Sequence, residues 1–474
     1  MPIDHRARWL DSFVDDLDLT LLEETYRGVG SEAYRPNLML KMVLYHVLEG
    51  RLSPAAWCKA ASESIPILWL GRGIRPSRTA LYNFRDRLGD KIQEIHALMV
   101  QQAIAEGLMD PQEGVQDGTT VRACASRHRL LNHKALARRQ EELQAAIAHD
   151  GTAQSPVTIP QWMAQTPRGR QQQAQRYAKA QETLEFRLRE NARRPKDKRL
   201  DENKVTVSPS DPEAPLGRDK EKVYCPLYTP QVLVEPDSRV PLVFEVFAQA
   251  TDAGTLTPML DAAARVIGHP LKAVAADAAY ATLLDLRDCR ERGIELFAPV
   301  QENDFTATKR ARQARDRIER DAFTWLPDEQ TYVCPQGHRL DYRGKEAKWR
   351  RGDQKVIEYR YRCSPEHCGN CPLRTRCVRN PNRGRIVKRL EGQELLDAHR
   401  AKMKTAEGEA HRRRRGQIIE RHFGDAKEHR NLRRLHGRGL RRARAEIGLV
   451  VVAQTALAIK KLREARATTQ HNGP

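Results

Sequence analysis

Three acidic residues stand where a carboxylate could take part in metal-dependent chemistry. Asp117 lies within the run GVQDGTTV, Asp277 follows the short apolar run AVAA, and Glu420 lies in QIIERHFGDAK. Two divalent cations about 3.5 to 4 Å apart are best held by carboxylates from several elements, because hard cations prefer oxygen ligands. The trio therefore predicts a two-metal site, although a cap, a turn or a surface charge is the favoured interpretation of each acid taken alone.

A lysine accompanies the third acid. Lys427 follows Glu420 by seven residues, and at about 3.6 residues per turn the two side chains lie on nearly the same face of a helix. A carboxylate for a metal ion and an ammonium for a neighbouring phosphate would then share one side. Two ordinary exposed charges on an amphipathic helix are the alternative.

Arginines crowd around this helix. Like charges at such density repel one another unless a polyanion, an acidic surface or acidic side chains offset them. The cluster therefore predicts contact with nucleic acid, with Lys427, Arg415, Arg421 and Arg430 as candidate contacts, and a solvated helix face is the alternative. The cluster comprises Arg412, Arg413, Arg414, Arg415, Arg421, Arg430, Arg433, Arg434, Arg438, Arg441, Arg442 and Arg444.

Five of the nine cysteines stand close together, which favours metal binding over disulfides in a chain without a visible export signal. Cys368 and Cys371 have the spacing that lets two thiolates reach one tetrahedral ion, and Cys334 and Cys377 could complete a four-sulfur zinc site. His338 and Cys363 are spare ligand candidates, and the spacing does not exclude an iron–sulfur cluster. The isolated cysteines are expected to pack in the core; they are Cys58, Cys124, Cys225 and Cys289.

Helical elements are expected to carry the amino-terminal basic residues. Apolar residues recur at helical spacing over residues 40–47 and 88–98, and Ser53 and Ser77 precede helical patterns as capping residues. The helix that begins after Ser77 carries Arg78 and Arg85. We interpret the region as a compact helical bundle whose basic residues contact phosphates or base edges, a solvated face again being the alternative.

The remainder alternates strands and helices. Strands are expected at 114–121, 223–234, 240–250, 273–276 and 295–299, and helices at 255–267 and 281–293. A strand, an acid, a helix and a strand in succession are typical of an α/β sheet with chemistry at a strand's carboxyl end.

Three further segments complete the chain. Two charged helical stretches, 133–148 and 171–191, predict a helical hairpin inserted after the first strand. The basic, Cys-rich, weakly periodic stretch 304–384 is interpreted as a second insertion. The final stretch, 393–466, is strongly helical, and its apolar part, 447–459, is expected to be a buried helix.

Charge and hydropathy narrow the class of protein. The chain has 474 residues with 82 Lys and Arg against 62 Asp and Glu, and the net charge of +20 indicates an anionic partner. The longest apolar stretch falls well short of the roughly 20 residues that span a bilayer, and no secretory signal is visible. We therefore expect a cytoplasmic protein with no membrane partner.

With these motifs the sequence resembles the DDE-type bacterial insertion-sequence transposases, and within them the 1182-like group of the insertion-sequence-5 superfamily. The resemblance includes YRP and LKMVLY near the amino terminus, the VQDGT, ADAAY and IERHFG blocks, and the Cys-bearing insertion. It implies an RNase H-like catalytic core with a helical N-terminal domain that binds the element's terminal repeats. The sequence departs from the superfamily at one point: the superfamily often has a tyrosine and an arginine upstream of the glutamate, whereas Gly416 occupies the place four residues before it here. One of the arginines 412–415 is the candidate substitute, and the sequence does not assign which one.

The resemblance also assigns roles. It makes Asp117, Asp277 and Glu420 the catalytic acids that hold two Mg²⁺ (or Mn²⁺) ions, with Lys427 as the accompanying lysine. It implies hydrolysis at the element's ends followed by joining of the 3′ ends to target DNA, by a homodimer or higher oligomer on double-stranded DNA. Two alternatives are a metal-dependent nuclease of the same fold that does not join strands, and a zinc-stabilised DNA-binding regulator.

The sequence thus predicts an α/β protein of four parts. They are a helical N-terminal DNA-binding domain (1–108), the first part of an RNase H-like catalytic core (109–303) with a helical insertion (130–220), a Cys-rich zinc-ribbon-like insertion (304–390), and a helical C-terminal part of the core (391–474).

Overall fold

The computed structural model describes residues 1–26, 33–150, 159–194, 196, 199–300, 318, 320–350, 354–378 and 381–471. By its contacts the chain forms two compact units, one of residues 1–274 with 414–474 and the other of residues 275–413. This division does not follow the boundaries at 304 and 390 expected from composition. Within the described residues, none of the helices combines the length and the apolar character that crossing a membrane requires.

The amino-terminal part of the first unit is helical, as the apolar spacing predicts. The side chain of Ser53 accepts the backbone N–H of Ala56, and that of Ser77 accepts the N–H of Ala80, so both expected caps are confirmed. The helices are α1 (Arg6–Asp15), α2 (Thr20–Glu23), α3 (Pro36–Leu48), α4 (Pro54–Glu63), α5 (Ile65–Leu70) and α6 (Arg78–Ala105).

A β-sheet forms the centre of the first unit, with the strand order β2-β4-β1-β6, and β6 comprises Ala273–Ala275. Its longest strand, β4 (Tyr224–Val234), pairs with β1, β2, β3 and β5. Nearly every residue of β4 is buried, because neighbouring strands and helices cover it. The partner strands and the helix that follows are β1 (Glu113–Gly118), β2 (Val121–Arg122), β3 (Leu216–Arg218), β5 (Pro241–Phe247) and α9 (Leu256–Ile267).

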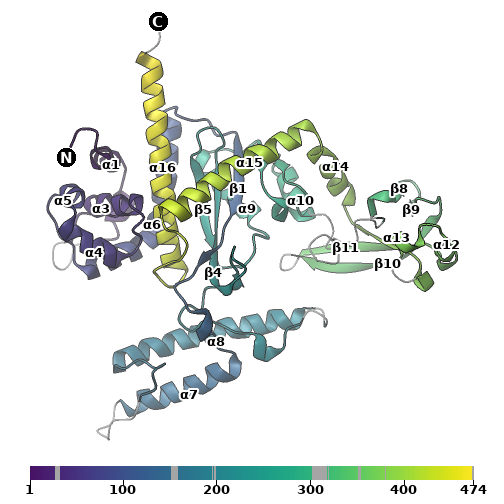
Figure 1. Ribbon diagram of the computed structural model, residues 1–474, viewed down its shortest axis with the longest axis horizontal. Helices are drawn as coiled ribbons and strands as arrows, with labels where there is room; N and C mark the ends of the chain where they lie inside the picture. Colours follow the sequence, from purple (N-terminus) through teal and green to yellow (C-terminus); the bar gives the residue numbers. More distant parts are fainter. Residues whose placement is uncertain are drawn as a thin grey trace. The chain divides into compact units, whose positions relative to one another are not determined.

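The expected helical hairpin is confirmed between β2 and β3. It consists of α7 (His133–His149) and α8 (Pro167–Arg193), which pack against each other (Figure 1). The pair has a small core of its own, to which Leu136, Leu143 and Leu184 contribute. Short 3₁₀ turns, η1 (Arg127–Arg129) and η3 (Glu202–Lys204), flank the hairpin.

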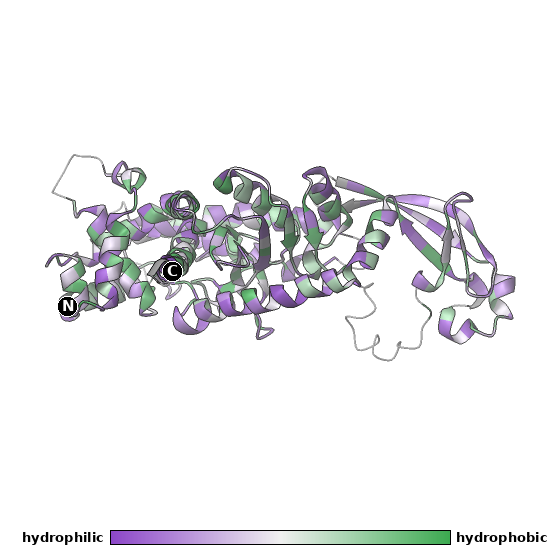
Figure 2. Ribbon diagram, turned by 90° about the horizontal axis from the view of Figure 1, so that it is seen from above, coloured by the Kyte–Doolittle hydropathy of each residue, from purple (hydrophilic) through white to green (hydrophobic). Residues whose placement is uncertain are grey.

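Two long helices pack side by side in the first unit. The expected buried helix is α16 (Leu440–His471), which lies along α6 and against β5 (Figure 1). A Cβ at Gly89 of α6 would lie 2.4 Å from the carbonyl oxygen of Arg441, so glycine permits this close approach. Hydrophobic residues gather on the sheet and on the helix faces that cover it (Figure 2).

Three elements near the division of the chain matter for the site. Helix α15 (Ala406–Gly424) continues into a π-helical turn, η7 (Asp425–His429). After this turn the chain returns to the sheet edge, where the N–H of Leu435 donates to the carbonyl of Arg122 at 2.8 Å. The short strand β6 (Ala273–Ala275) spans the division.

The second unit differs from expectation in the Cys-rich stretch. Where the sequence is weakly periodic, the structure has a five-stranded antiparallel sheet of order β12-β11-β10-β9-β8. Charged residues occupy many positions of the two long strands, β10 (Arg339–Arg350) and β11 (Gln354–Arg362), and they hide the alternation that would reveal a strand. The other strands of this sheet are β8 (Thr324–Leu326), β9 (Thr331–Val333) and β12 (Ile386–Leu390). The short strand β7 (Glu295–Phe297) also lies in the second unit but is not part of this sheet.

Helical elements accompany this sheet in the second unit. The helix expected at 281–293 is confirmed as α10. Residues 304–317, 319, 351–353 and 379–380 of the Cys-rich stretch lie outside the described residues. The elements are η4 (Ala278–Tyr280), α10 (Leu283–Glu291), η5 (Arg320–Ala322), α12 (Pro365–Gly369), α13 (Arg374–Cys377), η6 (Pro381–Arg383) and α14 (Gln393–Met403).

Candidate active site

Asp117 lies near the carboxyl end of β1, opposite Val232 of β4. One carboxylate oxygen accepts the N–H of Gly118 at 2.8 Å, and the other accepts a guanidinium N–H of Arg415 at 2.8 Å. The Asp117 side chain is 18% exposed and that of Arg415 is 21% exposed, so the pair is partly shielded from water. Asp117 therefore presents its oxygens at the surface end of a central strand, with a cation already beside them.

Gly118 allows other side chains to approach the end of β1. A Cβ on this residue would stand 2.0 Å from the side-chain nitrogen of Gln231 and 2.4 Å from a carboxylate oxygen of Asp252. The sequence suggested that the backbone here passes close to a ligand. In the structure, the space beside Gly118 holds the hydrogen bond from Gln231 to Asp252.

Glu420 is exposed on α15, whereas Ile418, Ile419 and Phe423 are buried. A Cβ at Gly416, one turn earlier, would lie 3.9 Å from a carboxylate oxygen of Glu420, so the side chain lies over a residue that occupies little space. The helix that carries Glu420 is tied to the end of β1 by the contact of Arg415 with Asp117.

Lys427 makes the second contact between this helical segment and β1. Its ammonium donates to the hydroxyl of Thr119 at 2.7 Å and to the carbonyl of Thr120 at 3.2 Å. Glu420 thus stands between two residues, Arg415 and Lys427, that both reach the carboxyl end of β1. No sequence signal singled out Thr119.

The π-helical turn changes the expected relation between Glu420 and Lys427. Lys427 lies within η7, where each residue advances the helix by less than the 100° of an α-helix, so the angle between the two side chains differs from the one that a continuous α-helix gives. Glu420 is exposed, and Lys427 is half-buried. Desolvation lowers the pKa of Lys427 to about 8, and the charges of Lys220 and Arg433 add to this effect.

Asp277 lies in the second unit, directly after β6. Its carboxylate accepts the N–H of Ala279 at 2.7 Å and caps the 3₁₀ turn η4. The side chain is half-buried. The sequence left a capping role open for each acid, and this acid has one, which leaves further lone pairs of the carboxylate for other partners.

The candidate DNA contacts fall into two groups. Arg78 and Arg421 are exposed. Arg430 is 9% exposed and donates to the carbonyl of Leu48 at 2.5 Å and to Asp425 at 3.2 Å. It therefore holds the end of α3 against η7, and its guanidinium has little surface left for DNA.

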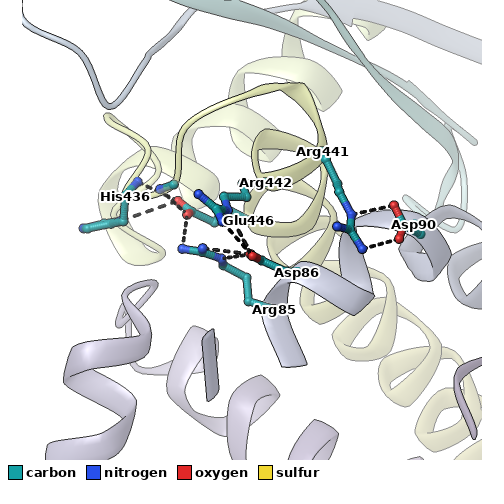
Figure 3. A network of polar contacts seen from close by, with 8 residues as sticks. Arg85, Asp86, Asp90, His436, Arg441, Arg442 and Glu446 are labelled. Atoms are coloured by element: carbon teal, nitrogen blue, oxygen red, sulfur yellow. Dashed lines mark hydrogen bonds and ion pairs between the residues drawn. The ribbon is translucent and has the colours of Figure 1, made fainter. Parts of the chain in front are cut away.

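Arg85 is also buried, at 1% exposure, and its guanidinium pairs with Asp86 at 2.8 Å and with Glu446 at 3.5 Å (Figure 3). Arg442 reaches Asp86 from α16, so these ion pairs join α6 to α16. Helical spacing alone did not reveal this network because it depends on α16. A DNA contact by Arg85 is inconsistent with its burial, and the residue is structural.

The Cys-rich stretch brings all five of its cysteines to one small cavity of about 20 Å³ in the second unit. The N–H of His338 donates to the sulfur of Cys334 at 3.4 Å, and the N–H of Arg385 donates to that of Cys368 at 3.4 Å. Burial raises the pKa of Cys363 to about 12, with Cys368 as the second cause. The lining also contains stacked imidazoles; the cysteine and histidine residues around the cavity are Cys334, His338, Cys363, His367, Cys368, Cys371 and Cys377.

Among the residues that the structure describes, no group of three His, Cys, Asp or Glu side chains has the arrangement that holds a metal ion. The chemistry of the acids is nevertheless suited to one. Asp117 and Glu420 offer carboxylate oxygens, the donors that Mg²⁺ prefers, and neither carboxylate is enclosed in the core.

Two families match the chain. The model described as "Transposase DDE domain" matches residues 333–462, which include the cysteine cluster, Glu420 and Lys427. The model described as "Transposase domain (DUF772)" matches residues 1–87, the amino-terminal helices. No curated protein matches the chain.

The mixed α/β fold and the matched domain define an enzyme that transfers phosphoryl groups on DNA. The chain is a transposase with a DDE domain and an amino-terminal transposase domain, and it therefore acts on DNA.

Proposed function

We propose that this transposase binds the ends of an insertion sequence, cuts them by metal-dependent hydrolysis and joins the freed 3′ ends to target DNA. The observation that carries the proposal is the attachment of α15 to the end of β1 by Arg415 and Lys427, with Glu420 between them. A phosphoryl transfer needs carboxylates and positive charges at one place. Here one carboxylate lies at a strand end, a second lies on the helix attached to it, and the two positive charges are those of Arg415 and Lys427.

In this proposal Asp117, Asp277 and Glu420 supply the carboxylates of an RNase H-like core. The support for Asp277 is its place directly after the short buried strand β6 and its half-buried carboxylate. When bound, a pair of Mg²⁺ or Mn²⁺ ions activates the attacking oxygen and stabilises the leaving 3′ oxygen. Lys427 binds a phosphate at the end of β1, and the exposed Arg421 of α15 adds a further positive charge.

Strand joining needs two ends held together, so we propose a homodimer or a larger oligomer on DNA. Arg78 at the start of α6 is the amino-terminal residue that remains available for the terminal repeats. The proposed interface omits Arg85 and Arg430, since their guanidinium groups are held inside the protein.

The decisive experiment incubates the purified full chain with Mg²⁺ and labelled duplexes that carry the DNA sequences flanking its gene. Joined products support transposition, and nicks without joining indicate a nuclease. We expect Asp117→Asn and Glu420→Gln each to reduce cleavage by about a thousandfold, equivalent to roughly 4 kcal/mol of transition-state stabilisation.

Glu409→Gln is the matched control, because Glu409 is an exposed acid on the same helix as Glu420. Its cleavage rate is expected to stay within twofold of the unchanged protein. All variants should retain DNA binding, measured without divalent cations. Equal cleavage by Glu420→Gln and Glu409→Gln would remove Glu420 from the chemistry.

We also propose that the cysteine cluster of the second unit binds one zinc ion. Cys334 and Cys368 each accept a backbone N–H at the sulfur, the kind of hydrogen bond that stabilises a thiolate. Cys371 and Cys377 line the same cavity and complete the set, while Cys363 remains a further donor. Elemental analysis of the purified full chain should find about one zinc per chain, whereas iron with acid-labile sulfide would indicate an iron–sulfur cluster.

A further inference from the structure

A second basic site lies in the first unit, apart from the candidate catalytic acids. A cavity of about 560 Å³ lies between the helical hairpin and the segment that follows η7. Five arginines from different segments line it: Arg129 of η1, Arg139 of α7, Arg176 of α8, and Arg434 and Arg438 between η7 and α16.

These arginines are not offset by acids. None of the described residues that line the cavity is acidic, and none of the five guanidinium groups forms an ion pair with a described acidic side chain. Arg138, the neighbour of Arg139 on α7, pairs instead with Glu142 outside the cavity. Partial desolvation lowers the pKa of Arg176, and the charge of Arg438 adds to this effect, which shows that like charges face one another here.

Contacts within the cavity wall also restrain two of the arginines. Arg139 stacks on Trp162 with its guanidinium carbon 4.9 Å from the ring centroid, and Trp162 also stacks on Tyr177. Arg438 donates to the carbonyl of Cys124 at 3.3 Å, which restricts its position. Such restraints lower the entropy that an arginine loses when it grips an anion.

We infer that this cavity binds phosphodiester groups of a DNA strand that continues from the catalytic site. Repulsion among unpaired arginines is a cost that a polyanion relieves, and guanidinium groups match phosphate geometry. The segment that carries Lys427 at the end of β1 runs on to Arg434, whose backbone bridges to Arg122 of β2. One stretch of chain therefore links the phosphate-binding lysine to the cavity, and the helical hairpin becomes part of the DNA interface. The inference rests on the proposed function.

The test measures the affinity of the full chain for a 30-base-pair duplex by fluorescence anisotropy at several salt concentrations, without divalent cations. The double variant Arg139→Gln/Arg176→Gln should bind about tenfold more weakly at 0.15 M salt. The slope of log affinity against log salt should become shallower by nearly two, one for each lost phosphate contact.

The matched control is Arg138→Gln/Arg189→Gln, which removes the same charge from exposed positions of the same two helices. It should change affinity by less than twofold. A second pair, Arg434→Gln/Arg438→Gln, approaches the cavity from the opposite wall and tests the inference if loss of Arg139 disturbs Trp162. Equal losses for cavity and control pairs would overturn the inference, because the effect would then follow net charge alone.

Three further outcomes distinguish free phosphate from DNA as the source of the anion and separate this inference from the proposed function. In the first outcome, inorganic phosphate raises the melting temperature of the unchanged chain but not of the cavity variant, while the two proteins bind DNA with equal affinity. The site then binds free phosphate, and the inference fails. In the second outcome, the cavity variant binds DNA more weakly but the unchanged protein never cuts DNA. The inference about the cavity is then supported, and the proposed function is wrong. In the third outcome, both cavity double variants cut DNA normally and bind it with unchanged affinity. The proposed function is then supported, and the inference about the cavity is wrong.

Discussion

At the level of single residues, Arg415 determines what Asp117 can bind. The guanidinium of Arg415 and any metal ion would compete for the carboxylate of Asp117, because Arg415 donates to one of its oxygens and the N–H of Gly118 donates to the other. Gly416 follows directly and makes room for the carboxylate of Glu420. Arg415 directly precedes Gly416, and its side chain contacts Asp117.

Removal of this arginine should strengthen metal binding. In Arg415→Gln, Mn²⁺ no longer competes with a guanidinium at 2.8 Å from the carboxylate, so its affinity should rise roughly five- to tenfold after allowance for solvent screening. Isothermal titration calorimetry of the full chain without DNA measures this change. The control is Arg414→Gln, because Arg414 pairs with Glu113 and Asp237 and not with Asp117. Weaker Mn²⁺ binding in Arg415→Gln than in the control would contradict the competition.

Lys427 gives the DNA affinity a pH dependence of its own. Its pKa of about 8 in the free protein means that the ammonium is charged below pH 8 and loses its proton above it. A bound phosphate favours the charged form, so affinity should fall as pH rises from 8 to 9, by at most about tenfold per pH unit.

The control for this prediction is Lys427→Arg, since arginine remains protonated throughout the range. Anisotropy titrations at pH 7, 8 and 9 should show a fall for the unchanged protein and a flatter profile for the variant. Parallel profiles would mean that Lys427 does not bind phosphate through its charge.

At the level of secondary structure, the elements that sequence could predict are those with local signals. Caps at Ser53 and Ser77 and apolar spacing identified α3, α4 and α6, and alternating apolar runs identified β4 and β5. These signals reside within a few residues of one another, so no knowledge of tertiary contacts was needed.

Other elements depend on distant partners and were not predictable. The π-helical turn η7 exists where Gln454 of α16 donates to the carbonyl of His422 and to Asp425, a partner about thirty residues away. In the candidate site, Asp117 and Glu420 could be selected by residue type and context. The contact that brings them together joins Arg415 to Asp117, which lie 298 positions apart, and no local sequence pattern predicts it.

The ion pairs between α6 and α16 show what such long-range contacts contribute. Glu446 is fully buried and accepts the backbone N–H groups of His436 and Gly437 as well as facing Arg85 (Figure 3). Glu446→Gln removes the negative charge and leaves the buried Arg85 with Asp86 alone. The free energy of unfolding should fall by about 3 kcal/mol, because a buried charge loses its partner.

Urea unfolding followed by circular dichroism measures this loss. Asp90→Asn provides the comparison, since it breaks the ion pair with Arg441 between the same two helices at an exposed position. An exposed pair contributes less than about 1 kcal/mol, so this variant should unfold near the urea concentration of the unchanged protein. Similar losses of unfolding free energy in the two variants would show that the buried ion pair of Glu446 stabilises the protein no more than the exposed pair does.

At the level of the whole molecule, the two compact units obtain their stability differently. The first buries long helices against a sheet, whereas the smaller cluster of the second gathers Phe323, Tyr332, Leu340 and Tyr361 with Cys363 and Cys368. A core of this size that includes several thiols is the kind that a structural metal stabilises. The proposed zinc ion should therefore matter for the folding of one unit and not of the other.

Chelation of the full chain should expose only the second unit. We expect amide hydrogen exchange in peptides of β10 and β11 to accelerate by at least tenfold after treatment with a zinc chelator, because closing of the sheet depends on the bound ion. Peptides of α6 and α16 should keep their protection. Cys368→Ser should reproduce the effect without chelator, whereas Cys225→Ser, at a buried thiol of β4 in the first unit, should retain zinc. Unchanged exchange in β10 and β11 after zinc removal would show that the sheet folds on hydrophobic contacts alone and that the cysteines do not hold it together.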